Sequence, residues 1–304
     1  MRNRRRARSQ DFDGRPGHEV DTRFLAAIVA LAAAVPPPTP AIDGLLDRAS
    51  AYVGRFEREF AQVISDEDYR QRVSGAMYRR AETRRTQAEM LFLWMEAQHD
   101  WLTVRNVRVI DGKPIPNSEN KLMSALAPTT EAPLAQLRRL RDESARFNIG
   151  HTFRNVNYPT MAIHVLEEKY RPRFGFAIEE RERIDGIEAW RVAYHEEQTP
   201  TLIQSERGQN LFARGRLWIA DADGRILRTT LEVEISANDT TMSTTVDYRR
   251  DAKLAMWVPG RMHELIEQRA AVPAQGRAIL SERIECTAEY TNYRRFETSG
   301  RIIQ

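Results

Sequence analysis

Histidine and cysteine are the side chains whose spacing says most about catalysis and metal binding in this sequence. The six histidines stand at positions 18, 99, 151, 164, 195 and 263, and no two have the spacing of metal ligands on a common element. Acids directly follow His99 and His195, but neighbours on a strand point to opposite faces, so both are interpreted as polar surface. The single cysteine, Cys286, excludes an intramolecular disulfide and a cysteine-based zinc site. Since it alternates with Ile284 and Ala288, we interpret it as a small buried strand residue.

The sequence lacks the motifs of common catalytic sites. G-x-x-x-x-G-K-[ST], G-x-G-x-x-G after a strand, H-E-x-x-H and G-x-S-x-G are all absent. Ser144, with Glu143 and His151 nearby, lies in a helical pattern without oxyanion glycines, so we interpret it as structural. The sequence therefore predicts no catalytic residues, no metal and no organic cofactor. A hydrolase whose site gathers carboxylates or a serine from distant segments stays open as an alternative.

The charge distribution argues against a nucleic-acid partner. The chain has 304 residues, 46 Lys and Arg, 43 Asp and Glu, and a formal net charge of +3. Residues 1–41 hold seven Arg and four acids, so residues 42–304 carry equal numbers of basic and acidic side chains. A nucleic-acid-binding domain normally concentrates positive charge to contact phosphates. The local cluster of Arg79, Arg80, Arg84 and Arg85 is interpreted as a solvated strand connection, which would also suit peripheral contact with lipid headgroups.

The N-terminal region has the pattern of a secretory leader. Phe24–Val35 is a run of twelve apolar residues, preceded by Arg23 and followed by a proline-rich stretch. This length suits the hydrophobic region of a signal peptide and is short of the roughly 20 residues that span a bilayer. We predict that the leader 1–41 directs export and that cleavage near Ala41 leaves a periplasmic or secreted chain. Because the charged region before the apolar run is long for a signal peptide, a translation start at Val20 is a further hypothesis.

Apolar periodicity predicts several helices in the first half of the chain. Residues spaced by three, four and seven predict amphipathic helices over 42–62, 119–127, 131–147 and 159–170. Asp43 is placed to cap the first of them. Extended segments are predicted over 61–73, 87–96 and 100–110, and a short helix is predicted near 261–268.

From Arg173 onwards the periodicity changes from 3.6 to 2, which is typical of strands. Asp-Gly turns at 111–112, 185–186 and 223–224 separate alternating runs and predict type I′ hairpins, and hence an antiparallel sheet. We predict one α+β domain over 42–304. Its curved antiparallel sheet, an incomplete β-barrel, packs against several helices, and residues 119–170 form a helical insertion.

One face of the predicted sheet is apolar over several strands. Residues two apart on a strand share a face, and the turn at 185–186 makes two such sets cross-strand neighbours. If a hydrophobic ligand binds this face between the covering helices of 42–62 and 131–170, we expect it to contact Phe174, Phe176, Ile178, Trp190, Val192, Tyr194, Leu217, Ile219, Leu231 and Val233. Trp190 would then report binding.

The stretch Gly215–Ile219, followed by Asp223–Arg228, resembles a hairpin of the outer-membrane lipoprotein-sorting superfamily, whose periplasmic carrier is LolA. Segments 248–251, 258–262 and 288–296 look like an uncharacterised group of secreted bacterial proteins related to it. The resemblance is clearest over about 210–297. It implies a half-barrel that holds helices against a concave apolar face, which in the carrier receives acyl chains.

These expectations favour an exported, non-enzymatic envelope protein that binds an acyl chain or a lipoprotein in the concave face of a half-barrel. Two alternatives stay open. One is the exported hydrolase described above, and the other is an envelope scaffold or interaction module without a ligand. A continuous apolar groove of several hundred Å³ would favour the first function, a polar cleft with converging acids the second, and a filled core the third.

Overall fold

The computed structural model describes residues 40–95, 100–126, 133–152, 154, 157–205, 207–236, 239–272, 277–296 and 302–303. These residues belong to one compact unit that begins at Pro40. The apolar run Phe24–Val35 of the predicted leader lies outside the described residues. No helix in the described part of the chain is long and apolar enough to cross a membrane.

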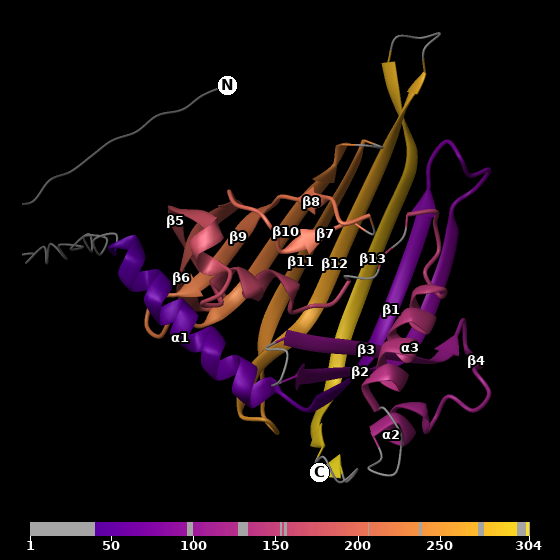
Figure 1. The fold of residues 1–304 in the computed structure, drawn as a ribbon, viewed down its shortest axis with the longest axis horizontal. Coiled ribbons are helices and arrows are strands. Elements are labelled where there is room, and N and C mark those ends of the chain that lie inside the picture. Colours follow the sequence, from indigo (N-terminus) through magenta and orange to yellow (C-terminus); the bar gives the residue numbers. More distant parts are fainter. Residues whose placement is uncertain are drawn as a thin grey trace, which may run out of the picture. The chain divides into compact units, whose positions relative to one another are not determined.

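A large antiparallel sheet dominates the fold (Figure 1). Its strands follow the order β4-β3-β2-β1-β13-β12-β11-β10-β9-β6-β5, with β14 paired to β13. Their bounds are β1 Val63–Ser74, β2 Glu82–Met95, β3 Asp100–Ile110, β4 Lys113–Pro114, β5 Phe174–Ile184, β6 Ile187–Glu196, β9 Ala213–Ala220, β10 Ile226–Ile235, β11 Thr240–Asp251, β12 Met256–Val272, β13 Arg277–Phe296 and β14 Ile302–Ile303. β7 (Ile203–Gln204) and β8 (Asn210–Leu211) form a separate pair. Since β4 and β5 stand at opposite ends of the order, the sheet is open, as predicted.

The helices are α1 (Ile42–Phe60), α2 (Lys121–Leu126), α3 (Pro133–Ala145) and the 3₁₀ helices η2 (Met161–Leu166) and η3 (Arg171–Arg173). The α-helix predicted over 159–170 is therefore wrong. All six residues of η2 are buried, so this segment has no solvent-facing stripe of the kind that the prediction assumed. Asp43 does not cap α1: the cap position is Ala41, and Asp43 lies in the first turn.

The helix predicted near 261–268 is also wrong, because β12 runs unbroken through this segment. Met262, Glu264 and Ile266 are buried, and they alternate with side chains such as His263 that are exposed. The buried acid Glu264 interrupts the apolar alternation, so the sequence does not show a strand there.

Two of the three Asp-Gly turns have the backbone expected of type I′. Asp111 and Gly112 have φ values of 48° and 79°, and Asp185 and Gly186 have 47° and 81°. At the third turn only Gly224 has a positive φ, 74°. The hairpin forms as predicted, but its connection is longer, since β9 ends at Ala220 and β10 begins at Ile226.

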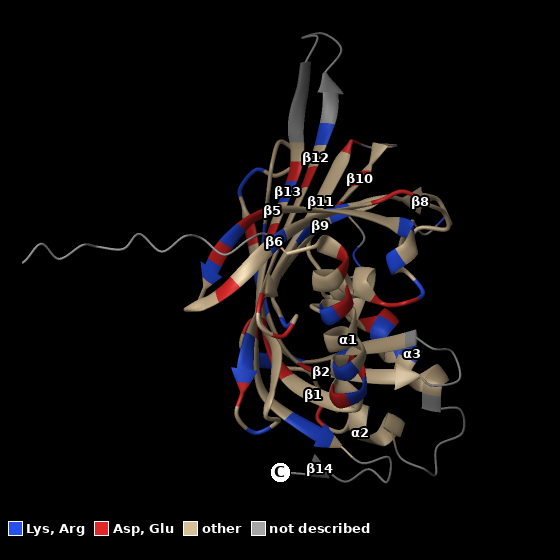
Figure 2. Cartoon of the chain, turned by 90° about the vertical axis from the view of Figure 1, so that its left-hand side faces the viewer, with Lys and Arg blue, Asp and Glu red and all other residues tan. Residues whose placement is uncertain are grey.

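The inner face of the sheet is the face on which α1 lies, and one row of register partners crosses it. This row runs from β1 to β5 through Tyr69, Ala288, Met262, Val246, Thr229, Leu217, Val192 and Ile178. α1 buries Leu45, Leu46, Ala49, Val53, Phe56 and Phe60, which follow the predicted helical spacing. Phe60 reaches the sheet, where its ring centroid lies 4.8 Å from that of Phe92. The strands bend around α1, as Figure 2 shows.

α2 and α3 do not cover the inner face. Leu122 of α2 and Leu137 of α3 cluster with Leu91 and Val104, which alternate along β2 and β3 with inner residues such as Phe92. Of the predicted covering segment 131–170, it is η2 that packs in the core of the inner face. The expectation that the helix over 131–147 covers the concave face is therefore wrong, because its apolar stripe packs on the opposite face of β2 and β3.

Away from α2 and α3, the outer face of the sheet carries many charged side chains. Ion pairs cross neighbouring strands, as between Arg191 and Glu179, 2.6 Å apart, and between Arg72 and Glu285, 3.7 Å apart. The blue and red segments of Figure 2 mark Lys, Arg, Asp and Glu residues along several of the strands. Solvent-accessible ion pairs of this kind contribute little to stability, but their charged groups favour contact with water. A site for an apolar ligand therefore belongs on the inner side.

Candidate functional site

The ten residues predicted to contact a ligand lie together on the inner face. All ten belong to the main hydrophobic cluster or pack against it. The register aligns Phe176 with Tyr194 and Ile178 with Val192, as predicted, while a bulge after Ile178 places Trp190 opposite Arg181. The predicted face is thus a real surface of the fold, although most of it is covered. Val192, Leu217 and Ile219 have no exposed area.

Two of the ten residues, Phe174 and Phe176, line a groove of about 820 Å³. One wall of this groove is α1, and the other is the segment 167–176, which includes η3. Leu231 and Val233 line a second, much smaller cavity of about 30 Å³ beside η2, which has room for about one water molecule. The apolar face therefore meets an open space mainly at its β5 end.

The walls of the groove are mixed in character. Apolar side chains lie beside several acids and two arginines, and the lining residues are Asp43, Leu46, Asp47, Ser50, Gly54, Glu57, Arg58, Glu167, Glu168, Arg171, Pro172, Phe174 and Phe176. Arg171 Nη1 donates to Asp47 Oδ1 at 2.8 Å, so an ion pair joins the two walls. The groove thus combines the apolar space expected for a lipid-like ligand with the converging acids expected for a hydrolase.

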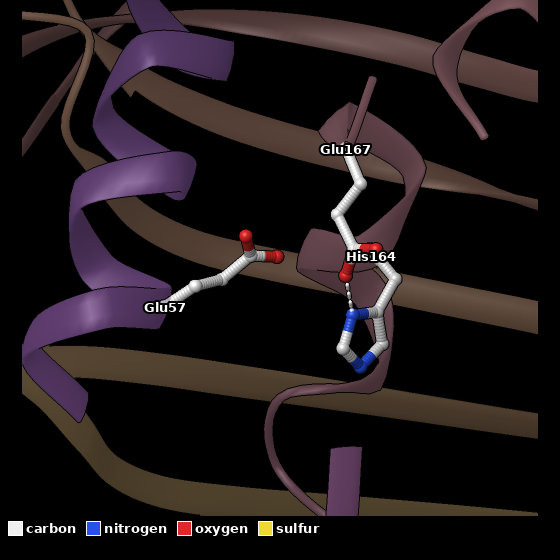
Figure 3. Close-up of side chains that lie close together, drawn as sticks. All are labelled: Glu57, His164 and Glu167. Carbon is white, nitrogen blue, oxygen red and sulfur yellow. Dashed lines mark hydrogen bonds and ion pairs between the residues drawn. The ribbon is translucent and has the colours of Figure 1, made fainter. Parts of the chain in front are cut away.

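Glu57, His164 and Glu167 form a compact cluster where the two walls of the groove meet (Figure 3). Glu57 extends from α1, whereas His164 and Glu167 belong to η2 and the residue after it. Nδ1 of His164 forms a hydrogen bond with Oε1 of Glu167, and the carboxylate of Glu57 points toward this pair. The three metal-ligand atoms lie within 4.8 Å of one another. His164 and Glu167 are buried, at 5% and 7% exposed, and Glu57 is half-buried beside them.

The two carboxylates of this cluster have opposite pKa shifts. Burial raises the pKa of Glu57, and the neighbouring carboxylate of Glu167 raises it further. Burial acts on Glu167 in the same direction, but the bond to His164, together with the charges of His164 and Lys169, outweighs it and lowers the pKa of Glu167. Two carboxylates that approach each other in a buried site hold a proton between them unless a cation replaces it.

The sequence alone does not reveal this cluster. No two histidines have the spacing of metal ligands, whereas the structure combines one histidine with two glutamates. His164 and Glu167 are three residues apart, and this spacing indicates that their side chains can lie close together. No pattern in the sequence connects them to Glu57. That connection depends on the packing of α1 against η2.

A second polar network lies on the inner face, over the β1 side of the sheet. Arg105 binds Glu67 through two nitrogens, at 2.6 and 2.9 Å, and also contacts Asn157. Arg154, 2% exposed, donates to the Tyr69 hydroxyl at 3.1 Å. The Asn157 side chain belongs to the same network, because its oxygen accepts from Arg105 and its amide nitrogen donates to the Tyr69 hydroxyl at 3.3 Å.

Other residues singled out in the sequence have structural positions. The Ser144 hydroxyl donates to the Arg141 carbonyl at 2.6 Å within α3. His195 pairs with Glu197 on the surface, as interpreted. Cys286 is buried, and this burial raises its pKa to about 11, which agrees with a small core residue. His99 lies outside the described residues.

No protein-family model matches the sequence, and no curated protein matches it. Among solved structures, the chain is similar to a DUF1329 family protein from Desulfovibrio piger, at 11% identity and a TM-score of 0.35, over 84% of this chain and 94% of that one. It is similar to a structure described as an outer membrane lipoprotein-sorting protein domain from Vibrio parahaemolyticus, at 10% identity and a TM-score of 0.35, over 82% and 93%. A LolA superfamily protein from Nitrosomonas europaea matches at 12% identity and a TM-score of 0.32, over 85% and 95%. The superfamily that the hairpin 215–228 resembles is thus represented among the matched structures.

Proposed function

We propose that this chain is an exported envelope protein that binds an amphipathic ligand, an acyl chain or a lipoprotein-like molecule, in the groove between α1 and residues 167–176. The observation that carries the proposal is the groove of about 820 Å³, into which Phe174 and Phe176 bring the apolar inner face. Binding sites for small molecules typically have volumes of about 300–1,000 Å³ and combine apolar walls with a few polar groups.

The chemistry of the lining suggests how such a ligand would lie. Leu46, Phe174 and Phe176 offer apolar surface for a hydrocarbon chain. Asp43, Glu168 and the ion pair of Arg171 with Asp47 leave polar groups for a headgroup in water. The ion pair joins a half-buried Arg171 to an exposed Asp47 at the edge of the groove, so opening it to admit a ligand costs about 1 kcal/mol.

Binding of a fluorescent polyene fatty acid to the full chain tests the proposal. We expect saturable binding by the parent chain, with a change in Trp190 emission, and at least tenfold weaker binding by Phe176→Ala, about 1.4 kcal/mol. Phe212→Ala is the matched control, because Phe212 is 50% exposed and lies outside the groove. The unfolding midpoint is measured on the same samples to separate lost binding from lost stability. Absence of binding by the parent, or equal binding by both variants, would overturn the proposal.

Export is tested separately by sequencing the N-terminus of the chain recovered from the cell envelope or the medium. We expect the mature chain to begin near Ile42, at the start of α1. Full-length protein in the cytoplasm, with none in the envelope or the medium, would contradict export without bearing on the groove.

A further inference from the structure

The cluster of Glu57, His164 and Glu167 contains a set of groups that binds metal ions in other proteins. It is the one group of three or more His, Cys, Asp or Glu residues with converging ligand atoms in the described part of the chain. One imidazole nitrogen and two carboxylate oxygens are a common ligand set for Zn²⁺ and for other divalent transition metals. Three protein ligands also leave further coordination positions for water or a bound molecule.

A second observation concerns a carboxylate oxygen of Glu57. Oε1 of Glu57 is buried and accepts no hydrogen bond from an N–H or O–H group in the described part of the chain. The large majority of buried side-chain polar atoms are hydrogen-bonded, so the facing carboxylates of Glu57 and Glu167 need a proton shared between them or a cation in its place. The nearby ammonium of Lys169 lies 3.5 Å from Oε2 of Glu167 instead.

From this geometry we propose that Glu57, His164 and Glu167 bind a divalent transition-metal ion, with Zn²⁺ as the ion that the ligand set fits best. The ion would take one oxygen of Glu57, one oxygen of Glu167 and Nδ1 of His164. In a tetrahedral zinc site these atoms lie about 3.4 Å apart at bond lengths of about 2.1 Å, a separation comparable with the spread of at most 4.8 Å among the three ligand atoms here. Since Glu57 and Glu167 also line the groove, the remaining position faces it.

A bound ion would also explain why distant segments bring these groups together. It would join α1 to η2, the two elements that cover the apolar inner face. The inference goes beyond the ligand-binding function proposed above and does not rest on it, because metal binding is measured without any lipid.

Titration of the full chain with Zn²⁺, after treatment with a chelator and dialysis, tests the inference. We expect one Zn²⁺ per chain and a higher unfolding midpoint in its presence. Glu57→Gln should weaken binding at least tenfold, since the amide keeps the shape of the side chain and removes the charge. Glu168→Gln is the matched control, because Glu168 is exposed in the same groove wall but outside the cluster.

A spectroscopic readout separates this site from adventitious binding on the surface. Co²⁺ bound to the parent chain should give visible absorption bands that Glu57→Gln loses and that Glu168→Gln retains. The inference is overturned if the parent chain binds no stoichiometric metal, or if Glu57→Gln binds Zn²⁺ and Co²⁺ as the parent does. Circular dichroism of each variant verifies that it is folded, and His164→Gln provides a second test if Glu57→Gln is not.

Discussion

Glu282 illustrates how much a single buried carboxylate can organise in this molecule. Its side chain has no exposed area and accepts hydrogen bonds from the Tyr78 hydroxyl at 2.5 Å and from the backbone N–H of His151 at 2.8 Å. The Thr152 hydroxyl adds a third bond at 2.8 Å. Glu282 therefore joins β13 to the turn between β1 and β2 and to the segment that follows α3.

These bonds make the stability of the fold depend on pH through Glu282. Burial alone would raise the pKa of Glu282, but the hydrogen bonds from Tyr78, His151 and Thr152 outweigh it and lower the pKa to about 2. Because the folded-state pKa lies below the unfolded value, the contribution is fully present above about pH 4.5 and is lost as the pH falls toward 2.

We expect Glu282→Gln to lower the free energy of unfolding by about 3 kcal/mol at neutral pH, because the amide cannot accept all of these bonds as an anion does. The difference from the parent chain should shrink between about pH 4.5 and 2, when followed by urea unfolding at each pH. Glu289→Gln on the exposed side of the same strand is the control, with an expected change below about 0.5 kcal/mol. A difference that stays constant with pH would exclude the charge of Glu282 as its cause.

At the scale of elements, local sequence patterns predict a strand and its buried face wherever the two faces of the strand differ clearly in polarity. The alternation of Trp190, Val192 and Tyr194, with a turn residue pair before it, predicted both the strand and its inner face. Patterns failed where a polar residue is buried, as at Glu264 in β12, or where a segment is buried on all sides, as in η2. In both cases tertiary packing, and not local periodicity, decides the structure.

The candidate site likewise has residues that local sequence patterns predict and residues that only tertiary packing brings together. Phe174 and Phe176 were predicted because they alternate on one strand. The Glu57–His164–Glu167 cluster was not, since it exists only once α1 packs against η2. The groove likewise depends on tertiary packing, because its two walls, α1 and residues 167–176, are far apart in the sequence.

The contact between the β9–β10 turn and α1 is an element-scale feature that a single glycine permits. Gly224 has a φ of 74°, and a Cβ placed there would lie 2.5 Å from the backbone carbon of Arg48 in α1. Such a distance is too short, so a side chain at this position has to displace the helix or the turn. Gly186 has a similar φ of 81° but has open space around it.

We therefore expect Gly224→Ala to destabilise the fold by about 2–3 kcal/mol and Gly186→Ala by about 1 kcal/mol, measured by urea unfolding. The conformational strain is common to both variants, so the difference between them reports the contact with α1. Equal losses for the two variants would show that the turn does not constrain the position of α1.

At the scale of the whole molecule, the chain has to pass from one edge of the sheet to the other. β4 and β5 stand at opposite ends of the strand order, and the connection between them carries α2, α3, η2 and η3. Part of this connection passes over the inner face, where Arg154 and Asn157 join the buried polar network. The inner face is thus divided into an apolar region over β5, β6, β9 and β10 and a polar region over β1 and β3.

Arg154 makes several buried hydrogen bonds in this connecting segment. Its guanidinium donates to Gln71 Oε1 at 2.8 Å and to the Ile149 carbonyl at 2.9 Å, in addition to Tyr69, whose own hydroxyl donates to Glu264 at 2.6 Å. Removing one partner of a buried charged network leaves the other polar groups unpaired in a medium of low dielectric constant. The resulting loss of stability is larger than the net stabilisation that the intact network provides.

We expect Arg154→Met to lower the free energy of unfolding by about 3–5 kcal/mol, because methionine replaces much of the volume but leaves the acceptors without a donor and removes the positive charge near Glu264. Arg154→Lys should cost less, since it keeps the charge but reaches fewer acceptors. Arg146→Met is the control on an exposed side chain, with an expected change below about 0.5 kcal/mol. All three are compared by urea unfolding. If Arg154→Met loses no more stability than Arg146→Met, the crossing segment is held by its apolar contacts, and the buried network is not what fixes it over the sheet.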